Sequence, residues 1–338
     1  MAAGLTPKVS ILLPVFDCEH TLAPALESVR RQTLTDFECV IVDDGSRDGT
    51  RTIAERMAAH DRRFRVIARD HAGLVQSLNV GLSECRAPFI ARMDGDDLMS
   101  PARLSASLGL LEQSPKLAGV GTRVRLFPRA TLTPKRRAYE AWLNAVRTPE
   151  DVRREAFVEC AVAHPTLTLR AEVLQRFAYQ DRGWPEDYDL LLRLLAAGQE
   201  LAVVPQRLHH WRDSPGRYSR THPACALKRF VECKAAFLAQ GFLSQTERYV
   251  LWGYGDTGKS LNRALASHGK RPSQIVELHP GRLGQWIHGA RVIAPAELVR
   301  VERAPIVVSV AGEVARGLIR AELTSMGFVE GSDYVMTA

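Results

Sequence analysis

The sequence of 338 residues contains no long apolar run and no low-complexity tract. No stretch approaches the roughly 18 to 20 uninterrupted apolar residues that a membrane-spanning helix needs. The first ten residues, MAAGLTPKVS, contain no apolar core of signal-peptide length. We therefore expect an intracellular, cytoplasmic protein, with peripheral association at the inner face of a membrane as an open alternative.

Cysteine is scarce and shows no pairing pattern. The six cysteines are scattered, without a CxxC pair or the spacing of metal ligands: Cys18, Cys39, Cys85, Cys160, Cys225 and Cys233. We expect buried, reduced thiols rather than structural zinc or disulfides.

The overall composition is that of an ordinary globular protein. Hydrophobic residues make up 46% and charged residues 25% of the sequence, which excludes a fibrous or largely disordered chain. Forty-five basic residues against 38 acidic residues give a formal net charge of +7. This excess favours an anionic partner, which can be a nucleotide or a lipid. Nucleic acid is not expected, because no nucleic-acid-binding module accompanies the charge.

Short apolar runs alternate with helical patterns in the first hundred residues. Four runs are suited to buried parallel strands: residues 9–14, 38–44, 64–68 and 88–94. Between them, apolar residues recur at the three-to-four spacing of amphipathic helices. Strand, helix and strand repeated in this way predict an α/β fold with a doubly wound, mostly parallel sheet and right-handed crossovers.

The pattern is less regular from about residue 101 to 220. We expect strands over 119–127 and 166–170, a helix around 137–157, and a helix from about 186 that ends at Gly198. After a linker near 241–247, a second alternation of strands and helices begins. The sequence thus predicts two α/β units of unequal size, residues 1–243 and 244–338.

Acidic residues follow two of the predicted strands. The second strand runs into VDDGS (42–46) and the fourth into MDGDD (93–97). Ligands of open parallel sheets bind beyond the carboxyl ends of the strands, where the strand order reverses. Carboxylates at this density suit Mg²⁺ or Mn²⁺, which would neutralise a pyrophosphate leaving group. An isolated acidic cluster can also simply cap the next helix.

Four ordered motifs resemble those of family 2 glycosyltransferases: PVFD (14–17), VDDGS (42–46), GLVQSLNVGL (73–82) with IARMDGDD (90–97), and GWPEDYDLLLRLLAAG (183–198). The similarity covers roughly residues 8–215. It implies the glycosyltransferase A fold, a nucleotide-sugar donor and inversion of configuration at the anomeric carbon.

The resemblance also implies a set of donor-binding residues. It assigns Pro14, Phe16 and Asp17 to the nucleoside pocket, and Asp44, with Asp43 beside it, to the base, usually uracil. A carboxylate can accept the N3 hydrogen of uracil, which favours a UDP-sugar.

The other donor contacts implied by the resemblance follow the third and fourth strands. Gly73 and Asn79 match positions near the sugar nucleotide, although a helix-start glycine and a polar helix face remain open alternatives. Asp94 and Asp96 match the DxD motif. The first would approach the ribose or sugar and contribute to the metal site, the second would hold Mn²⁺ or Mg²⁺, and Asp97 would substitute if the register differs by one.

The motif context assigns the catalytic base to Asp187. Inversion by single displacement needs one carboxylate that takes the proton of the acceptor hydroxyl as its oxygen attacks. Glu186 is the competing candidate, and both acids also suit a helix start, where free amides favour negative charge.

Two separate segments, HPT (164–166) and RLHHWRD (207–213), offer weaker candidates for contacts with the acceptor, the diphosphate or the metal. They are His164, His209, His210, Trp211 and Arg212. Arg212 would clamp a phosphate of the donor, and His210 would serve as a further metal ligand. The basic run from 207 to 220 is either a mobile loop over the donor or a solvated face.

The segment GYGDTGKS (253–260) fits two glycine motifs. Gly253, Gly255 and Gly258, with Glu277 at the end of the next predicted strand, match the dinucleotide-binding arrangement. The phosphate-binding P-loop fits poorly, because no later predicted strand ends in an aspartate for the metal. The segment resembles small Rossmann-like accessory domains, which leaves open both a packing module and a second ligand site.

Together these features predict an inverting, metal-dependent hexosyltransferase. It would move a sugar from a nucleotide diphosphate to a glycan or lipid-linked acceptor, in bacterial polysaccharide, lipopolysaccharide or glycolipid synthesis. Two alternatives stay open: a bifunctional protein whose C-terminal unit binds NAD or a nucleotide sugar and modifies a sugar, and a non-catalytic nucleotide-sugar-binding protein.

Overall fold

The computed structural model describes residues 6–338 and divides the chain into two compact units. The first comprises the residues up to Val152 together with Val162–Arg182 and Arg193–Arg217. The second comprises Arg153–Ala161, Gly183–Leu192 and Tyr218–Ala338. The predicted division at residue 243 follows chain order and stays a prediction.

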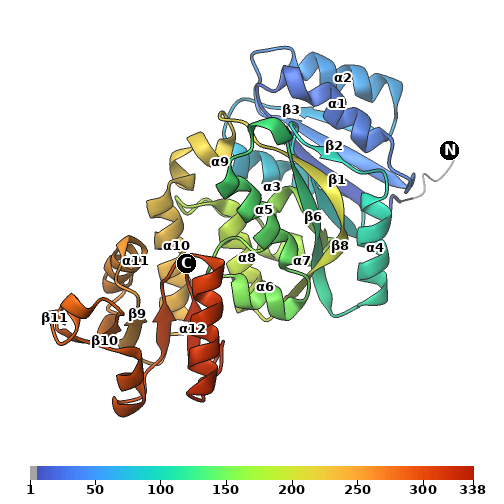
Figure 1. Ribbon diagram of the computed structural model, residues 1–338. Coiled ribbons are helices and arrows are strands. Elements are labelled where there is room, and N and C mark those ends of the chain that lie inside the picture. Colours follow the sequence, from blue (N-terminus) through green and yellow to red (C-terminus); the bar gives the residue numbers. More distant parts are fainter. Residues whose placement is uncertain (1–5) are drawn as a thin grey trace. The chain divides into compact units, whose positions relative to one another are not determined.

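The first unit is built on an eight-stranded sheet with the strand order β3-β2-β1-β4-β7-β6-β8-β5 (Figure 1). Its strands are β1 Val9–Val15, β2 Phe37–Asp43, β3 Phe64–Ala68, β4 Phe89–Arg92, β5 Leu98–Met99, β6 Leu117–Phe127, β7 Thr168–Arg170 and β8 Glu200–Arg212. Strands β1 to β4 are mutually parallel, and β7 pairs antiparallel with β4 and β6. The predicted mostly parallel α/β sheet is therefore confirmed.

Helices cover both faces of the parallel strands. The helices within the first unit are α1 Glu19–Arg30, α2 Thr50–His60, α3 Leu74–Glu84, α4 Arg103–Gln113, α5 Pro134–Ala145 and α7 Ala171–Phe177. One face of β1 packs against α1 through Leu22, Leu26 and Val29. On the other face α3 lies so close that a Cβ at Gly81 would stand 2.3 Å from Leu12 Cδ1. Burial on both faces explains why these strands have no polar alternation.

The helix predicted around 137–157 is interrupted. Helix α5 ends at Ala145, Val146 adopts extended backbone angles, and α6 spans Pro149–Glu155. A residue before proline is disfavoured from the helical region, so Pro149 separates the two helices and begins the second. The single-helix prediction is wrong for this reason.

The longest strand was not expected. Strand β8 runs over 13 residues and pairs in parallel with β6, with register shifts beside Thr122 and Arg123. The shifts leave Pro205 and Gln206, and then Leu208, without a partner on β6, as in bulges. The run from 207 to 220, predicted as a mobile loop or solvated face, is thus strand as far as Arg212.

The second unit contains a six-stranded sheet with the order β11-β12-β10-β9-β13-β14. Its strands are β9 Arg248–Trp252, β10 Arg271–Val276, β11 Trp286–Ile287, β12 Ala290–Ile293, β13 Ile306–Val308 and β14 Tyr334–Met336. Only β11 pairs antiparallel. The last strand, β14, was not predicted.

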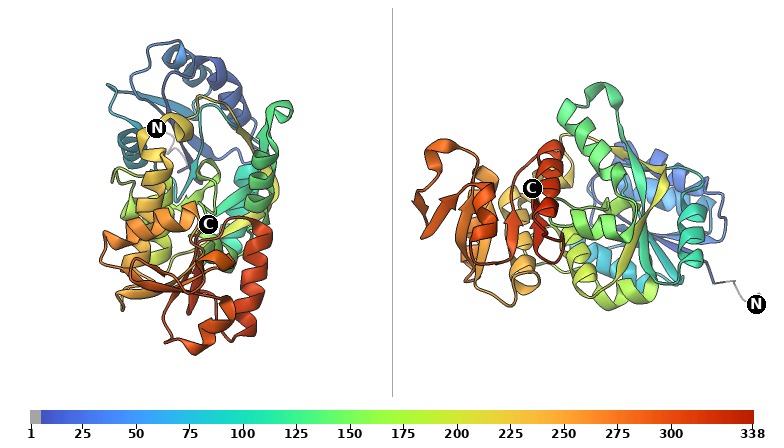
Figure 2. Two further views of the ribbon diagram at one scale, coloured as in Figure 1. Left: turned by 60° about the vertical axis from the view of Figure 1, so that its left-hand side comes forward. Right: turned by 60° about the horizontal axis from the view of Figure 1, so that its bottom comes forward.

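Helices also lie on both faces of the second sheet (Figure 2). Helices α10 Leu227–Gln240 and α11 Asp256–Ala266 pack on one face, and α12 Glu313–Ser325 packs on the other. The short helix α9 spans Tyr218–Thr221, and α8, Glu186–Ala196, begins in this unit. The predicted Rossmann-like alternation is therefore present.

The six cysteines are free, as predicted. Cys39, Cys85 and Cys233 are buried, whereas the other three are half-buried, so the expectation of burial holds for only part of the set. Within residues 6–338, no helix is both long and apolar enough to cross a bilayer.

Candidate active site

The reversal of strand order lies at β1, which has β2 on one side and β4 on the other. The chain leaves the sheet after each of these strands toward the same edge. Asp43 ends β2 and Asp44 follows it, while the acidic segment 94–97 follows β4, so both acidic segments lie at the carboxyl ends of β1's two neighbours. The topology thus brings the predicted donor-binding motifs of the first unit to one edge of the sheet.

Asp44 anchors the loop between β3 and α3. Its carboxylate accepts hydrogen bonds from the backbone amides of Ala72 at 3.1 Å and Gly73 at 2.8 Å. His71 Nδ1 lies 2.8 Å from the same carboxylate, which is almost fully buried. Gly73 has φ +93°, a conformation that favours glycine. Asp44 therefore has a structural role that the sequence did not indicate, and its contact with a base stays a prediction.

Phe16 is exposed beside this loop. Its ring stacks on the ring of His71 with the centroids 4.4 Å apart, while 42% of the residue remains accessible. The neighbouring Asp17 accepts a hydrogen bond from the Arg47 amide, and its own amide donates to Ser46 Oγ. This arrangement joins the ends of β1 and β2 and leaves one face of an aromatic pair available for a planar ligand.

Two other predicted residues of the nucleoside pocket lie within the strands. Pro14 sits in β1 opposite Val42 of β2, and Asp43 accepts a hydrogen bond from the Ser46 amide at 3.2 Å. Both are buried. They shape the turn after β2, which carries Asp44.

Asn79 is engaged elsewhere. Its side-chain amide donates to the carbonyl of Tyr179 and accepts from the Tyr179 amide, at 2.9 and 3.0 Å. Tyr179 in turn places its hydroxyl 3.0 Å from His164 Nε2. Asn79 thus holds the segment around Tyr179 against α3. These contacts give no support to the predicted contact of Asn79 with the donor, which stays a prediction.

Three carboxylates converge after β4. Side-chain oxygens of Asp94, Asp96 and Asp97 all lie within 4.8 Å of one another, and no other such group of potential metal ligands occurs among residues 6–338. His210, predicted as a further metal ligand, is outside this group. The three carboxylates differ in how many contacts they already make with the protein.

Asp97 is already committed to the protein. The residue is completely buried, Oδ2 lies 2.8 Å from His209 Nε2, and Oδ1 accepts from the backbone amide of Arg212 at 2.7 Å. The other ring nitrogen of His209 faces Arg103 Nη1 at 3.3 Å. Because a guanidinium only donates, His209 Nδ1 accepts and Nε2 carries the proton toward Asp97.

Asp94 and Asp96 are more open. Asp94 Oδ1 accepts from Arg92 Nη2 at 2.6 Å, which leaves its other oxygen unconstrained by that pair. Within the described part of the chain, no other side chain donates a hydrogen bond to the Asp96 carboxylate. Arg212 Nε donates to the backbone carbonyl of Asp96 instead. The geometry favours Asp96 and Asp94, rather than Asp97, as ligands of a cation.

The electrostatics of the acidic loop favour added positive charge. Burial, together with the charges of Asp97 and Asp94, raises the pKa of Asp96 to about 7. Burial and the charge of Asp94 also raise the pKa of Asp97. Burial opposes ionisation of Asp94 as well, but the charges of Arg92 and Arg217 contribute to a net lowering of its pKa. Hard oxygen ligands that repel one another in this way fit a divalent cation such as Mg²⁺ or Mn²⁺.

Two buried arginines support the loop and were not predicted. Arg92, at the end of β4, is bonded to Asp94 and to the carbonyl of Met93. Arg103, at the start of α4, is fully buried, donates to the carbonyl of Arg92 at 2.6 Å, and has a pKa lowered to about 9 by burial. The only sequence signal is a charged residue inside an otherwise apolar strand or helix pattern.

Strand β8 presents its paired histidines differently. His209 is completely buried against Asp97, whereas His210 is half-buried, and its ring lies 6.5 Å from that of Phe127. Successive side chains of a strand point to opposite faces, so only one of the two can contact the Asp97 carboxylate. The residue that does so is His209.

Arg212 and Trp211 complete the end of β8. The Arg212 guanidinium lies 4.6 Å over the Phe127 ring and holds the Asp96 carbonyl, beside the place predicted for a diphosphate. Trp211 is buried with residues of α5, and Arg217 covers its ring at 4.4 Å. His164 is likewise buried, and burial lowers its pKa to about 3, so it is a neutral core residue.

Glu186 and Asp187 begin helix α8 in the second unit. The amide of Tyr188 donates to Asp187 Oδ1 at 2.7 Å, and the Trp184 indole donates to Asp189 Oδ1 at 2.9 Å. Glu186 is buried and Asp187 is half-buried, which makes Asp187 the more accessible of the two predicted bases. The helix start and its acidic first turn are as predicted, and the catalytic role stays a prediction.

The glycine loop of the second unit has the geometry of a dinucleotide-binding turn. Gly253 has φ +92°, and a Cβ at Gly258 would lie 2.0 Å from the Gly253 carbonyl oxygen, whereas a Cβ at Gly255 would meet nothing within 4 Å. Glu277, however, accepts from the Tyr254 amide at 3.1 Å and pairs with Arg282 at 3.3 Å. The acid therefore holds its own loop, and ligand binding there stays a prediction.

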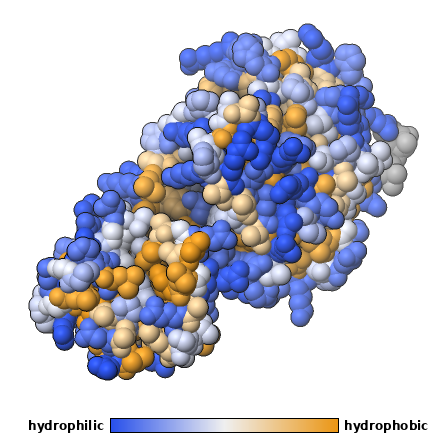
Figure 3. Space-filling view, viewed as in Figure 1, coloured by the Kyte–Doolittle hydropathy of each residue, from blue (hydrophilic) through white to orange (hydrophobic). Residues whose placement is uncertain are grey.

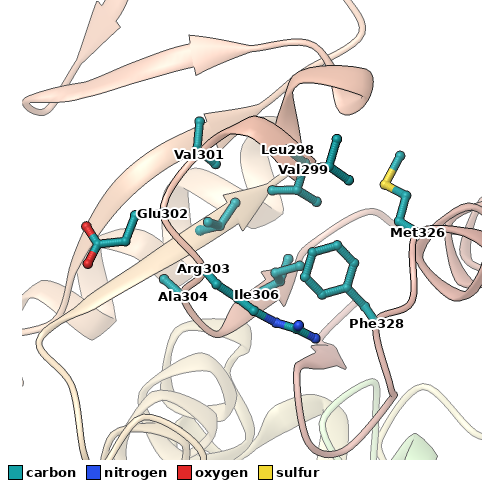
Figure 4. A pocket seen from close by; sticks show the side chains of 10 residues that line it. Leu298, Val299, Val301, Glu302, Arg303, Ala304, Ile306, Met326 and Phe328 are labelled. Carbon is teal, nitrogen blue, oxygen red and sulfur yellow. The ribbon is translucent and has the colours of Figure 1, made fainter.

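Apolar side chains gather on the visible face of the second unit (Figure 3). Apart from Phe16, every large hydrophobic residue found exposed in residues 6–338 belongs to this unit. A cavity of about 170 Å³ is lined mainly by residues between 298 and 306 and by two residues that follow α12. Leu298, Met326 and Phe328 point toward one another there (Figure 4). It has no cluster of catalytic groups, so the chemistry-bearing residues remain those of the acidic loop and of α8.

The chain is similar in sequence to known proteins. The model of the family described as "Glycosyl transferase family 2" matches residues 10–177. The putative glycosyltransferase EpsE of Bacillus subtilis is 31% identical over 226 residues, which are 63% of this chain and 76% of that protein. The amylovoran biosynthesis glycosyltransferase AmsE of Erwinia amylovora is 28% identical over 249 residues, covering 72% of this chain and 91% of that protein.

Solved structures show the same fold at low sequence identity. Residues 1–349 of TarS from S. aureus, in complex with UDP-GlcNAc, match with a TM-score of 0.55 and 15% identity, covering 77% of this chain and 71% of that one. The mannosyltransferase PcManGT from Pyrobaculum calidifontis, in complex with GDP-Man and Mn²⁺, matches with a TM-score of 0.53 and 15% identity, covering 78% and 70%.

The sheet of the first unit, with its reversal of strand order at β1, has the glycosyltransferase A fold of these solved structures. The chain belongs to glycosyl transferase family 2.

Proposed function

We propose that this protein transfers a sugar, with inversion, from a UDP-sugar to a hydroxyl group of a glycan or lipid-linked acceptor during polysaccharide assembly. The observation that carries the proposal is the group of three carboxylates within 4.8 Å at the switch point of the sheet. AmsE, whose name refers to amylovoran biosynthesis, and TarS, solved with UDP-GlcNAc, support the reaction class and the donor.

The donor nucleoside would lie over the ends of β1 and β2. The exposed ring of Phe16, backed by His71, offers a stacking surface for a base. Asp17 and the 43–46 turn border that surface through their mutual hydrogen bonds. Stacking tolerates any base, so the preference for uracil depends on polar contacts near Asp44.

Asp96 and Asp94 would hold the divalent ion, since Asp97 is enclosed by His209 and Arg212. When bound, Mg²⁺ or Mn²⁺ supplies positive charge that stabilises the departing diphosphate. The Arg212 guanidinium, placed at the Asp96 carbonyl, would share this role toward the phosphates.

Asp187 would act as the base on the acceptor. A new bond forms between the acceptor oxygen and the anomeric carbon, and the bond from that carbon to the diphosphate oxygen breaks. The acceptor proton passes to Asp187, and UDP leaves with the electron pair. The Tyr188 amide donates to Asp187 Oδ1, and the start of a helix favours negative charge at this position.

Turnover of a panel of nucleotide sugars with and without Mn²⁺ tests the proposal. Asp187→Asn should retain donor binding and lower turnover by about 10²- to 10⁴-fold. Asp96→Ala should abolish the extra thermal stabilisation by donor that depends on Mn²⁺. Asp256→Asn, at a fully exposed aspartate of α11, is the control and should behave as wild type. Full activity in both site variants, or retention of anomeric configuration in the product, would contradict the proposed mechanism.

A further inference from the structure

Two arginines face each other across the β6–β8 pair. Arg123 of β6 is directly opposite Arg207 of β8, immediately after the register shift. Paired positions on neighbouring strands project to the same face, so two guanidinium groups share one patch of surface. Like charges in this arrangement repel each other and weaken the sheet.

A third arginine joins the pair. The carbonyl of Arg147 accepts a hydrogen bond from the Val203 amide at 2.8 Å, which fixes the chain after α5 beside β8. Partial burial and the positive charges of Arg147 and Arg207 lower the pKa of Arg123. We name Arg123, Arg147 and Arg207 the arginine cluster.

The arginine cluster has no acidic counterpart. Among the described residues, none of its three guanidinium groups forms an ion pair or a side-chain hydrogen bond, and Arg123 Nε is buried without a partner. Arginines close by are neutralised: Arg129 pairs with Glu140, and Arg136 pairs with Asp213 at 3.1 Å. In this respect the arginine cluster differs from Arg129 and Arg136.

The same face leads to the acidic loop. On this face of the two strands, the next pairs are Arg125 with His210 and Phe127 with Arg212. Arg212 holds the Asp96 carbonyl. Phe127 lies four positions after Arg123 in β6, which corresponds to about 13 Å along the strand. The arginine cluster thus lies on a cationic path that ends at the predicted donor diphosphate site.

We propose that the arginine cluster binds a phosphate group carried by the acceptor. Three guanidinium groups close together suit a multiply charged oxyanion, since each can donate two parallel hydrogen bonds to phosphate oxygens. The phosphate restores the balance of charge that the protein itself does not supply. Its source is either a phosphorylated glycan or the headgroup phosphate of a lipid-linked acceptor.

The distance assigns the phosphate to the acceptor rather than to the donor. The diphosphate of a donor held at Asp96 spans less than the distance of about 13 Å that separates Arg212 from the arginine cluster along the strands, so it cannot reach both. This assignment rests on the proposed function, whereas anion binding by the cluster does not depend on it.

The test is titration of the full-length protein with inorganic pyrophosphate in EDTA, which removes any cation from the acidic loop. We expect saturable binding with one site. Arg123→Gln/Arg207→Gln should weaken it at least about tenfold, because two charge-assisted contacts are lost. Arg207→Gln alone, at an exposed position, should weaken it to an intermediate degree. Arg62→Gln/Arg300→Gln removes the same charge from exposed positions elsewhere and should bind as wild type.

Vesicles separate the two sources of phosphate. Binding to phosphatidylglycerol in phosphatidylcholine vesicles, but not to phosphatidylcholine alone, and competition by pyrophosphate would assign the site to a lipid headgroup. Pyrophosphate binding without vesicle binding would assign it to a phosphorylated glycan. Equal pyrophosphate affinity in the cluster and control variants would overturn the inference. So would preferential binding of a single-stranded oligonucleotide that depends on the cluster.

The result is independent of the donor reaction. Asp96→Ala should keep pyrophosphate binding in EDTA while losing the Mn²⁺-dependent stabilisation by donor. Conversely, Arg123→Gln/Arg207→Gln should keep donor stabilisation, which also shows that the variant is folded. Failure of one pattern with success of the other therefore identifies which of the two proposals is wrong.

Discussion

His209 Nε2 lies 2.8 Å from Asp97 Oδ2, and both side chains are almost completely enclosed by the protein. The two residues are 112 positions apart, so this contact ties β8 to the loop after β4. Arg103, on the far side of the His209 ring, holds the carbonyl of Arg92 from the same strand end. The position of the open carboxylates, Asp94 and Asp96, depends on this buried chain of contacts.

Replacement of His209 by alanine should destabilise the first unit. It leaves Asp97 and Arg103 buried with a lost partner, which should lower the free energy of unfolding by about 3 kcal/mol or more. His210→Ala, at the next residue but on the opposite face, should lower it by less than about 1 kcal/mol. Chemical denaturation measures both, and equal losses would contradict the assignment of His209 to the loop.

Phe16→Ala should weaken donor binding without unfolding the protein. Stacking of a base on an aromatic ring contributes about 1 to 3 kcal/mol, so the Kd of the donor should rise at least about fivefold. The melting temperature without donor should stay close to wild type, because Phe16 is 42% exposed. Trp286→Ala, at an aromatic residue of the second unit that is 72% exposed, should leave donor affinity unchanged, and an unchanged Kd in Phe16→Ala would exclude the stacking role.

Gly258→Ala should disrupt the glycine loop of the second unit. The added Cβ would lie 2.0 Å from the Gly253 carbonyl oxygen, so backbone must shift, at a cost of about 2 kcal/mol or more. Gly255→Ala is the matched change, because its Cβ meets no atom within 4 Å and its φ of −76° suits alanine. Thermal unfolding of both variants provides the comparison. Equal melting temperatures would show that the loop has a different geometry.

Lys234 predicts a pH dependence of stability. It is buried in α10, its Nζ donates to the carbonyls of Val158 and Thr337, and burial lowers its pKa from 10.5 to about 8. Between these two pH values the unfolded chain binds more protons than the folded chain, so the stability contributed by Lys234 rises with pH.

The measurement is denaturant unfolding of wild type and Lys234→Met from pH 7 to 10. The stability of wild type relative to Lys234→Met should increase over this range, by up to about 3 kcal/mol. A neutral amine still donates to both carbonyls, so the contacts survive deprotonation. Lys228→Met, at an exposed position of the same helix, should give a difference that does not change with pH below 10. A pH-independent difference for Lys234→Met would contradict the lowered pKa.

The parallel strands and the acidic loop were predictable because their signals are local. Strands β1 to β4 are continuous apolar runs, and each carboxylate segment follows such a run directly in the sequence. The helix start at Glu186 was equally local, given by Pro185 and a pair of acids. Where a motif and the strand or helix that carries it lie within ten residues of each other, the sequence is sufficient to predict both.

Strand β8 was not predictable for the opposite reason. Pro205, Gln206 and Arg207 interrupt its apolar pattern at the bulge, and its pairing with β6 joins residues about 80 positions apart. A second irregularity, the unpaired Leu208, decides which of His209 and His210 faces Asp97. Periodicity alone cannot assign the face of a strand once an unpaired residue shifts its alternation.

The distinct roles of Asp96 and Asp97 were likewise beyond the sequence. Both match the acidic motif within one residue, and only the tertiary contacts of His209 and Arg212 distinguish the enclosed carboxylate from the open one. Asn79 illustrates the same limit, since its amide is matched to the backbone of Tyr179 a hundred residues away.

The chain passes between its two compact units five times, at residues 153, 162, 183, 193 and 218. Phe157 and Val158, in the segment Arg153–Ala161, pack against the two cores of the second unit. Tyr188, in the segment Gly183–Leu192, stacks on Phe230 with the ring centroids 4.1 Å apart. A single recombination event that exchanged only the C-terminal stretch with a related protein would leave these side chains behind. The second unit is therefore expected to be inherited together with the segments that surround the predicted base, so that the two change in step during divergence.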